Sequence, residues 1–191
     1  LLVHPLLALE QGLASQVMRH WLAKHGQSMP GSAVLTEFLL QLGKQRPDND
    51  TQLTSADYVL RVWNNRIYIC EKNPAEQDAA YEMLWDGLHA LPLPRGGSLR
   101  WNGTAAPVTR VCYRRGGEKI QLAGRAQHHS VKKCLSVILP PWQRARLPFV
   151  YNEQGELLAV GNCLLSEPLQ RLQQQYSCTL TWQDESEHRD E

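Results

Sequence analysis

The 191-residue sequence has no apolar run that approaches the roughly 18–20 residues a helix needs to cross a bilayer. The apolar start Leu1–Val3 has no basic segment before it and leads into an amphipathic pattern, so we do not interpret it as a signal peptide. The five cysteines are far apart, and no two of them have the C-x-x-C spacing of a zinc or redox site. We therefore expect a cytoplasmic protein whose cysteines are reduced and mostly buried.

The motifs of common catalytic sites are also missing. The sequence has no Gly-rich phosphate loop, no Ser-Gly-Gly-x-Asp-Ser run and no nucleophile elbow. The adjacent His128 and His129 lack further ligands at metal-binding spacing, and Asp48 and Asp50 lie in a turn-rich loop where we expect them to be solvated. We expect a binding unit without a catalytic site or a metal, and the missing initial Met suggests a piece of a longer protein.

Charge is unevenly distributed, although the whole chain carries a net charge of only +1. Residues 1–100 carry −1, residues 101–183 carry +6 and residues 184–191 carry −4. Residues 110–146 hold nine basic side chains and a single acid, Glu118. A surface kept basic for solubility normally mixes both signs. The asymmetry therefore favours a nucleic-acid or other phosphate-bearing partner for the second half of the chain.

The first half has the pattern of a small α+β unit. Apolar residues at helical spacing predict a helix from about Leu6 to Lys24, and a second helix at 32–43 with an apolar face of Leu35, Phe38, Leu39 and Leu42. The two faces pack most economically as a helical hairpin. Residues 58–63 and 66–70 are rich in β-branched and aromatic side chains and predict a β-hairpin around Asn64-Asn65.

In the second half, Ser130 is the expected N-cap of a helix that buries Val131, Cys134, Leu135 and Ile138 and leaves Lys132 and Lys133 in solvent. Gly116-Gly117 predicts a tight hairpin loop from which the chain returns antiparallel. Strands are expected at residues 98–101, 108–113, 120–122, 147–151, 157–160 and 180–182.

The predicted fold class is α+β. An N-terminal helical hairpin with a β-hairpin precedes a small mixed α/β C-terminal domain with an antiparallel sheet. The expected divisions are a first domain at 1–74, a linker with short strands at 75–106, a second domain at 107–183 and an acidic, disordered tail at 184–191.

The segment 124–133 is a loop that leads into a helix N-terminus, where free backbone N–H groups favour an anion. Lys132 and Lys133 in the first turn oppose the helix dipole, which a bound phosphate would offset. The alternative is an ordinary solvated helix face. Trp142 beside two prolines has two interpretations as well, a side chain that fills the core or a platform for a base.

These residues also carry a resemblance to a known family. A Gly-Arg loop at 124–125, a Lys-Lys helix, the run Pro-Pro-Trp-x-Arg-x-Arg-x-Pro at 140–148 and a strand ending in Tyr151 resemble the C-terminal domain of tRNA(Ile)-lysidine synthetases. The helices and hairpin upstream look like the substrate-binding domain of that family. The sequence departs from the pattern at His129, where relatives usually have Lys, and at 137–139, where they tend to have Glu-x-Gly.

The resemblance implies a function for the parent enzyme. Such enzymes use ATP, with magnesium, to activate the wobble cytidine of a minor isoleucine tRNA, and lysine then forms lysidine. It implies that this chain is the tRNA-binding portion of such a C–N ligase and that the catalytic domain lies outside it. A generic RNA- or protein-interaction module of another RNA-modifying enzyme is the alternative.

Matching the motif gives a first group of expected contacts to the RNA backbone. These are Arg125, Lys132, Lys133, Arg144 and Arg146. A second, looser group is Arg114, Arg115 and Lys119, and His129 is a weaker contact that depends on pH.

Overall fold

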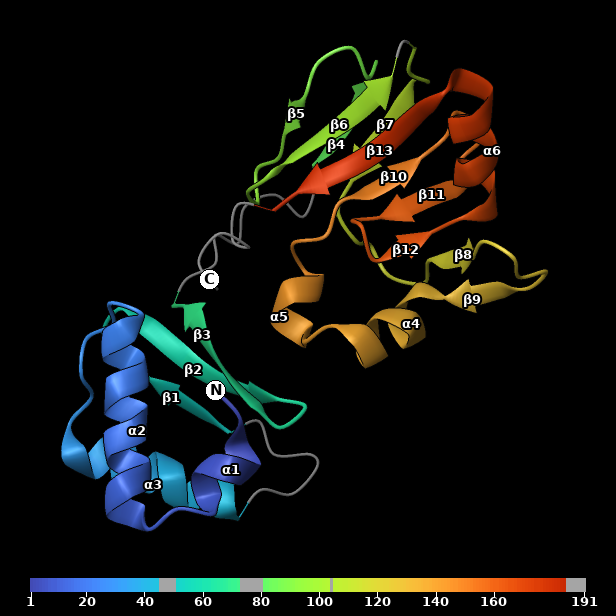
Figure 1. The fold of residues 1–191 in the computed structure, drawn as a ribbon. Coiled ribbons are helices and arrows are strands. Elements are labelled where there is room, and N and C mark those ends of the chain that lie inside the picture. Colours follow the sequence, from blue (N-terminus) through green and yellow to red (C-terminus); the bar gives the residue numbers. More distant parts are fainter. Residues whose placement is uncertain (45–50, 73–80, 104, 185–191) are drawn as a thin grey trace. The chain divides into compact units, whose positions relative to one another are not determined.

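The computed structural model describes residues 1–44, 51–72, 81–103 and 105–184 (Figure 1). The chain divides into two compact units, Leu1–Pro74 and Ala75–Glu191, and each is described by itself. The fold class is α+β, as predicted, with helices followed by antiparallel sheets. The turn-rich loop around Asp48 and Asp50, residues 75–80 and 104 of the expected linker, and the tail beyond Asp184 lie outside the described residues. Nowhere in the described part is a helix both long and apolar enough for a membrane span.

The N-terminal unit places three helices beside a three-stranded antiparallel sheet of order β1-β2-β3 (Figure 1). Its elements are α1 (Val3–Leu7), α2 (Gln11–Lys24), α3 (Ser32–Gly43), β1 (Gln52–Thr54), β2 (Tyr58–Trp63) and β3 (Arg66–Glu71). The predicted hairpin is confirmed, because β2 pairs with β3 and both asparagines of its turn have positive φ, 45° at Asn64 and 61° at Asn65. The apolar face predicted for α3 is buried from Leu35 to Leu42.

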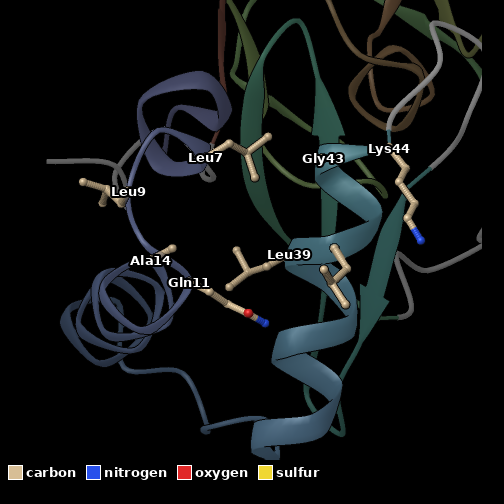
Figure 2. A pocket seen from close by; sticks show the side chains of 8 residues that line it. Leu7, Leu9, Gln11, Ala14, Leu39, Gly43 and Lys44 are labelled. Atoms are coloured by element: carbon tan, nitrogen blue, oxygen red, sulfur yellow. The ribbon is translucent and has the colours of Figure 1, made fainter.

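The single helix predicted from Leu6 to Lys24 is wrong. The backbone is extended at Glu10, which separates α1 from α2, and Leu13 is 48% exposed. After this break the buried positions are Ala14, Met18 and Leu22. Leu9, at the break, borders an apolar pocket of about 360 Å³ that also contacts Leu7 and Leu39 (Figure 2).

The C-terminal unit is built around a five-stranded antiparallel sheet of order β12-β11-β10-β7-β4 (Figure 1). Its strands are β4 (Glu82–Trp85), β7 (Thr109–Cys112), β10 (Phe149–Tyr151), β11 (Leu157–Val160) and β12 (Leu164–Leu165). A second sheet of order β13-β6-β5 contains β5 (Leu91–Pro92), β6 (Ser98–Gly103) and β13 (Cys178–Gln183). The remaining elements are the pair β8 (Lys119–Gln121) and β9 (His128–Ser130), and the helices α4 (Val131–Ile138), α5 (Pro141–Arg144) and α6 (Glu167–Tyr176).

Both faces of the five-stranded sheet are buried, as the alternation of side chains along its strands shows. On β10, Val150 packs with the second sheet and α6, whereas its neighbour Phe149 packs on the other side with Ile120, Val131 and Leu135. The pair β8–β9 and helix α4 therefore cover one face of this sheet, and the second sheet with α6 covers the opposite face.

The prediction that residues 120–122 pair antiparallel with the strand at 108–113 is wrong. Strand β7 lies inside the sheet, paired with β10 on one edge and β4 on the other, so neither of its edges is available to β8. Strand β8 pairs instead with β9, a segment that was expected to be loop. The glycines of the intervening loop do have the expected positive φ, 101° at Gly116 and 82° at Gly117.

The core beneath α4 provides a test of this arrangement. Leu135 is completely buried, whereas Val137 on the same helix is 74% exposed. We expect Leu135→Ala to lower the free energy of unfolding by about 2–4 kcal/mol, because it removes buried methyl groups and leaves a cavity. Val137→Ala is the matched control and should change it by less than about 0.5 kcal/mol. Urea unfolding followed by circular dichroism measures both, and equal losses would contradict the burial of this face.

Candidate nucleic-acid interface

The side chains of the hairpin formed by β8 and β9 lie alternately on its two faces. Lys119 is paired with Ser130, and Gln121 with His128, so these positions share one face. Ile120 and His129 are paired on the other face, where Ile120 is buried against the sheet. His129, the expected pH-dependent contact, is half-buried on that face, whereas His128 is exposed beside Lys119 and Gln121.

Helix α4 continues directly from β9 and presents its two lysines to solvent. Val131 and Leu135 are completely buried, and Lys132 and Lys133 in the first turn are exposed, as the sequence pattern predicts. Ser130 is the N-cap residue, but its hydroxyl accepts no hydrogen bond from the helix. Because Lys119 is paired with Ser130, it lies next to the start of α4, and Figure 1 shows the hairpin and the helix side by side.

The loop that carries Arg125 is attached to the rest of the C-terminal unit by its backbone. The N–H of Gly124 donates to Oε2 of Glu167 at 3.1 Å, and the N–H of Arg125 donates to the carbonyl of Leu122 at 3.0 Å. The turn requires φ of +71° at Gly124, a conformation that favours glycine. The side chain of Arg125 is exposed at the end of this anchored turn.

Arg114 and Arg115, from the second predicted group, are engaged with carboxylates. Arg115 forms an ion pair with Glu82, whose other oxygen lies 3.0 Å from Nη1 of Arg110. The hydrogen bond from Arg110 and then that from Arg115 lower the pKa of Glu82. Nε of Arg114 lies 3.8 Å from Oε2 of Glu118.

Glu118 is the acid around which the loop before β8 is organised, and its side chain is 10% exposed. Its Oε1 accepts hydrogen bonds from the backbone N–H groups of Arg115 and Gly116, each at 2.6 Å. Burial acts to raise the pKa of Glu118, but its own backbone N–H, those of Gly116 and Arg115, and the charge of Arg114 lower it below its usual value of 4.5.

Arg144 and Arg146 donate to the backbone of the same unit. Nε of Arg144 donates to the carbonyl of Leu139 at 2.7 Å, near the end of α4, and burial followed by the charge of Arg114 lowers its pKa. Nε of Arg146 donates to the carbonyl of Arg95 at 3.1 Å, and its Nη2 lies 3.4 Å from Asp184. These arginines stabilise the connection between α4 and β10, whether or not they also contact a ligand.

Four of the predicted cations remain without an ion pair to any described residue. They are Lys119, Arg125, Lys132 and Lys133, and we call them the hairpin–helix cations. All four are exposed and lie within fifteen residues of sequence on β8, the β8–β9 turn and α4. A cationic surface of this kind attracts the phosphates of a polyanion. Over the described ranges, no cluster of three or more His, Cys, Asp or Glu side chains is placed to hold a metal ion.

Sequence reasoning missed the residues that share this surface with Lys119. Gln121, His128 and Tyr151 were not among the predicted contacts. The signal that would have found Gln121 and His128 is the pairing of 119–121 with 128–130, because it places alternate side chains of both strands on one face. This register was not predicted, because residues 120–122 were expected to pair with the preceding strand instead.

The fold and the hairpin–helix cations define a two-unit α+β protein with a cationic surface suited to binding a polyanion. Two family models match the chain, the TilS substrate binding domain over residues 1–68 and the TilS substrate C-terminal domain over residues 109–182. The chain therefore belongs to the tRNA(Ile)-lysidine synthase family, as a substrate-binding domain followed by a C-terminal domain.

Individual relatives agree with this assignment. The tRNA(Ile)-lysidine synthase of Xylella fastidiosa (strain Temecula1 / ATCC 700964) is 30% identical over 177 residues, 88% of this chain and 40% of that protein. The enzyme of Xanthomonas campestris pv. campestris (strain 8004) is 29% identical over 186 residues, 94% and 42% of the two chains. This chain thus spans about two-fifths of the length of these relatives. A solved TILS C-terminal domain aligns at a TM-score of 0.40 with 18% identity, covering 55% of this chain and 98% of its own.

The carboxylate of Glu118 gives a prediction on stability. Since its folded-state pKa lies below the usual value of 4.5, the ionised group stabilises the fold above that pH, and this stabilisation is lost as the pH falls through the folded-state pKa. We expect Glu118→Gln to cost about 1–3 kcal/mol at neutral pH and to flatten the loss of stability on acidification. Urea titrations at a series of pH values measure this, with the exposed Glu153→Gln as control. An unchanged acid dependence in Glu118→Gln would contradict the hydrogen-bonding role of Glu118.

Proposed function

We propose that this chain is the tRNA-binding portion of a tRNA(Ile)-lysidine synthase. It acts in the cytoplasm, where it holds a minor isoleucine tRNA while a catalytic domain outside this chain ligates lysine to the wobble cytidine. The observation that carries the proposal is the set of hairpin–helix cations, which are exposed and have no ion pair with any described residue. Phosphate contacts from such cations supply affinity and position the RNA.

We propose two roles for the predicted contacts. Lys132 and Lys133 at the start of α4, Arg125 at the hairpin turn and Lys119 on β8 bind phosphates directly. Arg114, Arg115, Arg144 and Arg146 already donate to carboxylates or backbone carbonyls, so they hold the loops that carry the surface and add positive potential to it. Contacts of this kind recognise the shape of an RNA helix more than its sequence.

ATP and magnesium belong to the catalytic domain in this proposal. The residues of this chain do not fit them, because the sequence has no Gly-rich phosphate loop and the described part offers no cluster of carboxylates for a divalent cation. No step of the ligation is therefore assigned to a side chain of this chain, and on its own it is predicted to bind tRNA without modifying it.

The direct test is the affinity of the chain for a transcript of the minor isoleucine tRNA, measured by filter binding over a range of salt concentrations. Four phosphate contacts predict that the logarithm of the association constant falls with that of the salt concentration with a slope of about −3. Binding without salt dependence, or no binding at all, would contradict the proposal. Equal affinity for unrelated tRNAs would favour a general RNA-binding module instead.

Charge reversal locates the contact surface in the same assay. Lys132→Glu combined with Lys133→Glu should weaken binding by at least about tenfold and reduce the magnitude of the salt slope by about 1.5, because two of the four contacts are lost. Arg100→Glu, an exposed position on β6, makes the same kind of change outside the hairpin–helix cations and serves as control. If both proteins lose affinity equally, total charge and not this surface determines binding.

A further inference from the structure

A pocket of about 380 Å³ lies beside the hairpin–helix cations in the C-terminal unit. It is bounded by the hairpin β8–β9, by the turn between β10 and β11, and by the start of α6. The residues that line it are Glu118, Lys119, Gln121, His128, Tyr151, Gly155, Glu156, Leu157 and Pro168. Its volume is at the lower end of the range of small-molecule pockets, about 300–1,000 Å³. It therefore has room for one small planar group and its attached sugar.

We propose that this pocket receives one unpaired nucleobase of the bound RNA, an inference that rests on the function proposed above. Lys119 belongs both to the pocket and to the hairpin–helix cations, so a strand whose phosphates follow those cations passes the pocket entrance. RNA-binding proteins commonly read sequence from bases that are splayed out of a helix, because the grooves of an RNA duplex reveal little of it.

The charges that line the pocket favour a base over a phosphate. Two carboxylates, Glu118 and Glu156, lie among the lining residues together with the cation Lys119. Carboxylates repel phosphate but accept hydrogen bonds from the amino and imino groups of a base edge. Oε2 of Glu118 accepts no hydrogen bond from any described residue, although it is buried and 3.8 Å from Nε of Arg114. Because that atom is buried, Glu118 acts on the pocket through its negative charge, and the exposed Glu156 is the carboxylate that a base edge can reach.

Gln121 and His128 supply mixed polar groups opposite each other on the two strands. Their pairing in the hairpin places both side chains on the pocket face. Nε2 of Gln121 donates to the carbonyl of Arg125 at 3.3 Å, which orients the amide and leaves its oxygen as an acceptor. Amide and imidazole groups both donate and accept, as the edges of bases require.

Tyr151 supplies an aromatic surface in the pocket wall. The guanidinium carbon of Arg110, its partner on the neighbouring strand β7, lies over one face of the ring at 4.6 Å from the ring centre. Burial raises the pKa of Tyr151 to about 12, so its hydroxyl keeps its proton and can donate. Bases stack on aromatic side chains of this kind whatever their identity.

The test compares three RNA probes with the 191-residue chain. They are a blunt RNA duplex, the same duplex with a short single-stranded 3′ extension, and that extended duplex with abasic nucleotides in the extension. The chain should bind the extension with bases about tenfold more tightly than the abasic one, because only the bases enter the pocket. Equal affinities for the two extended probes would overturn the proposal while leaving the RNA-binding function intact.

Substitutions of residues that line the pocket test whether the pocket causes the preference for the extension with bases. Gln121→Ala and His128→Ala should remove the preference for bases without changing the affinity for the blunt duplex, and a retained preference in both overturns the proposal. Gln127→Ala, an exposed neighbour in the same hairpin that does not line the pocket, should retain the preference.

If no duplex binds, the function proposed above fails, and titration with AMP and CMP monitored by the imidazole NMR signals of His128 still examines the pocket. If neither nucleotide shifts the His128 signals, the proposal that the pocket binds a base is overturned too.

Discussion

The burial of Ile120, Val131 and Leu135 against one face of the five-stranded sheet is the contact on which the cationic surface depends. Each of these side chains is at most 1% exposed. Because neighbouring side chains of a strand or helix point in different directions, burying these three forces Lys119, Lys132 and Lys133 into solvent. Apolar packing therefore determines where the positive charge lies, and it holds these lysines close together although like charges repel.

The arginines around this contact show how positive charge is used inside the unit. Arg144 and Arg146 donate to backbone carbonyls, and Arg115 pairs with Glu82. A guanidinium group suits this task because its donors are arranged in a rigid plane. Lysines, with flexible and strongly hydrated ammonium groups, remain at the exposed positions. The nine basic residues that the sequence concentrates at 110–146 thus divide between holding the scaffold and facing a partner.

The sequence predicted elements whose signals are local and failed where pairing between distant segments decides the structure. The turn at Asn64-Asn65 was correct, as were the buried Val131 and Leu135 and the exposed lysines of α4, since turn chemistry and helical periodicity are contained in a few residues. Ile138, predicted to be buried on the same helix, is 45% exposed. The partner of β8 was wrong because the edges of β7 are occupied by β10 and β4, which no local pattern reveals. Helix α6 was missed because its Gln-rich sequence buries only Leu169 completely. The predicted cations could be named from the family motif, but which of them are paired depends on these tertiary contacts.

The central claim is that the hairpin β8–β9 and the first turns of α4 form the RNA-binding surface. Hydrogen exchange measured by mass spectrometry, with and without the minor isoleucine tRNA, tests it most directly. The account predicts slower exchange of backbone amides between residues 119 and 135 when tRNA is bound, and unchanged exchange in β6 and β13 of the second sheet. Slower exchange in that sheet, with none in the hairpin and helix, would contradict the account.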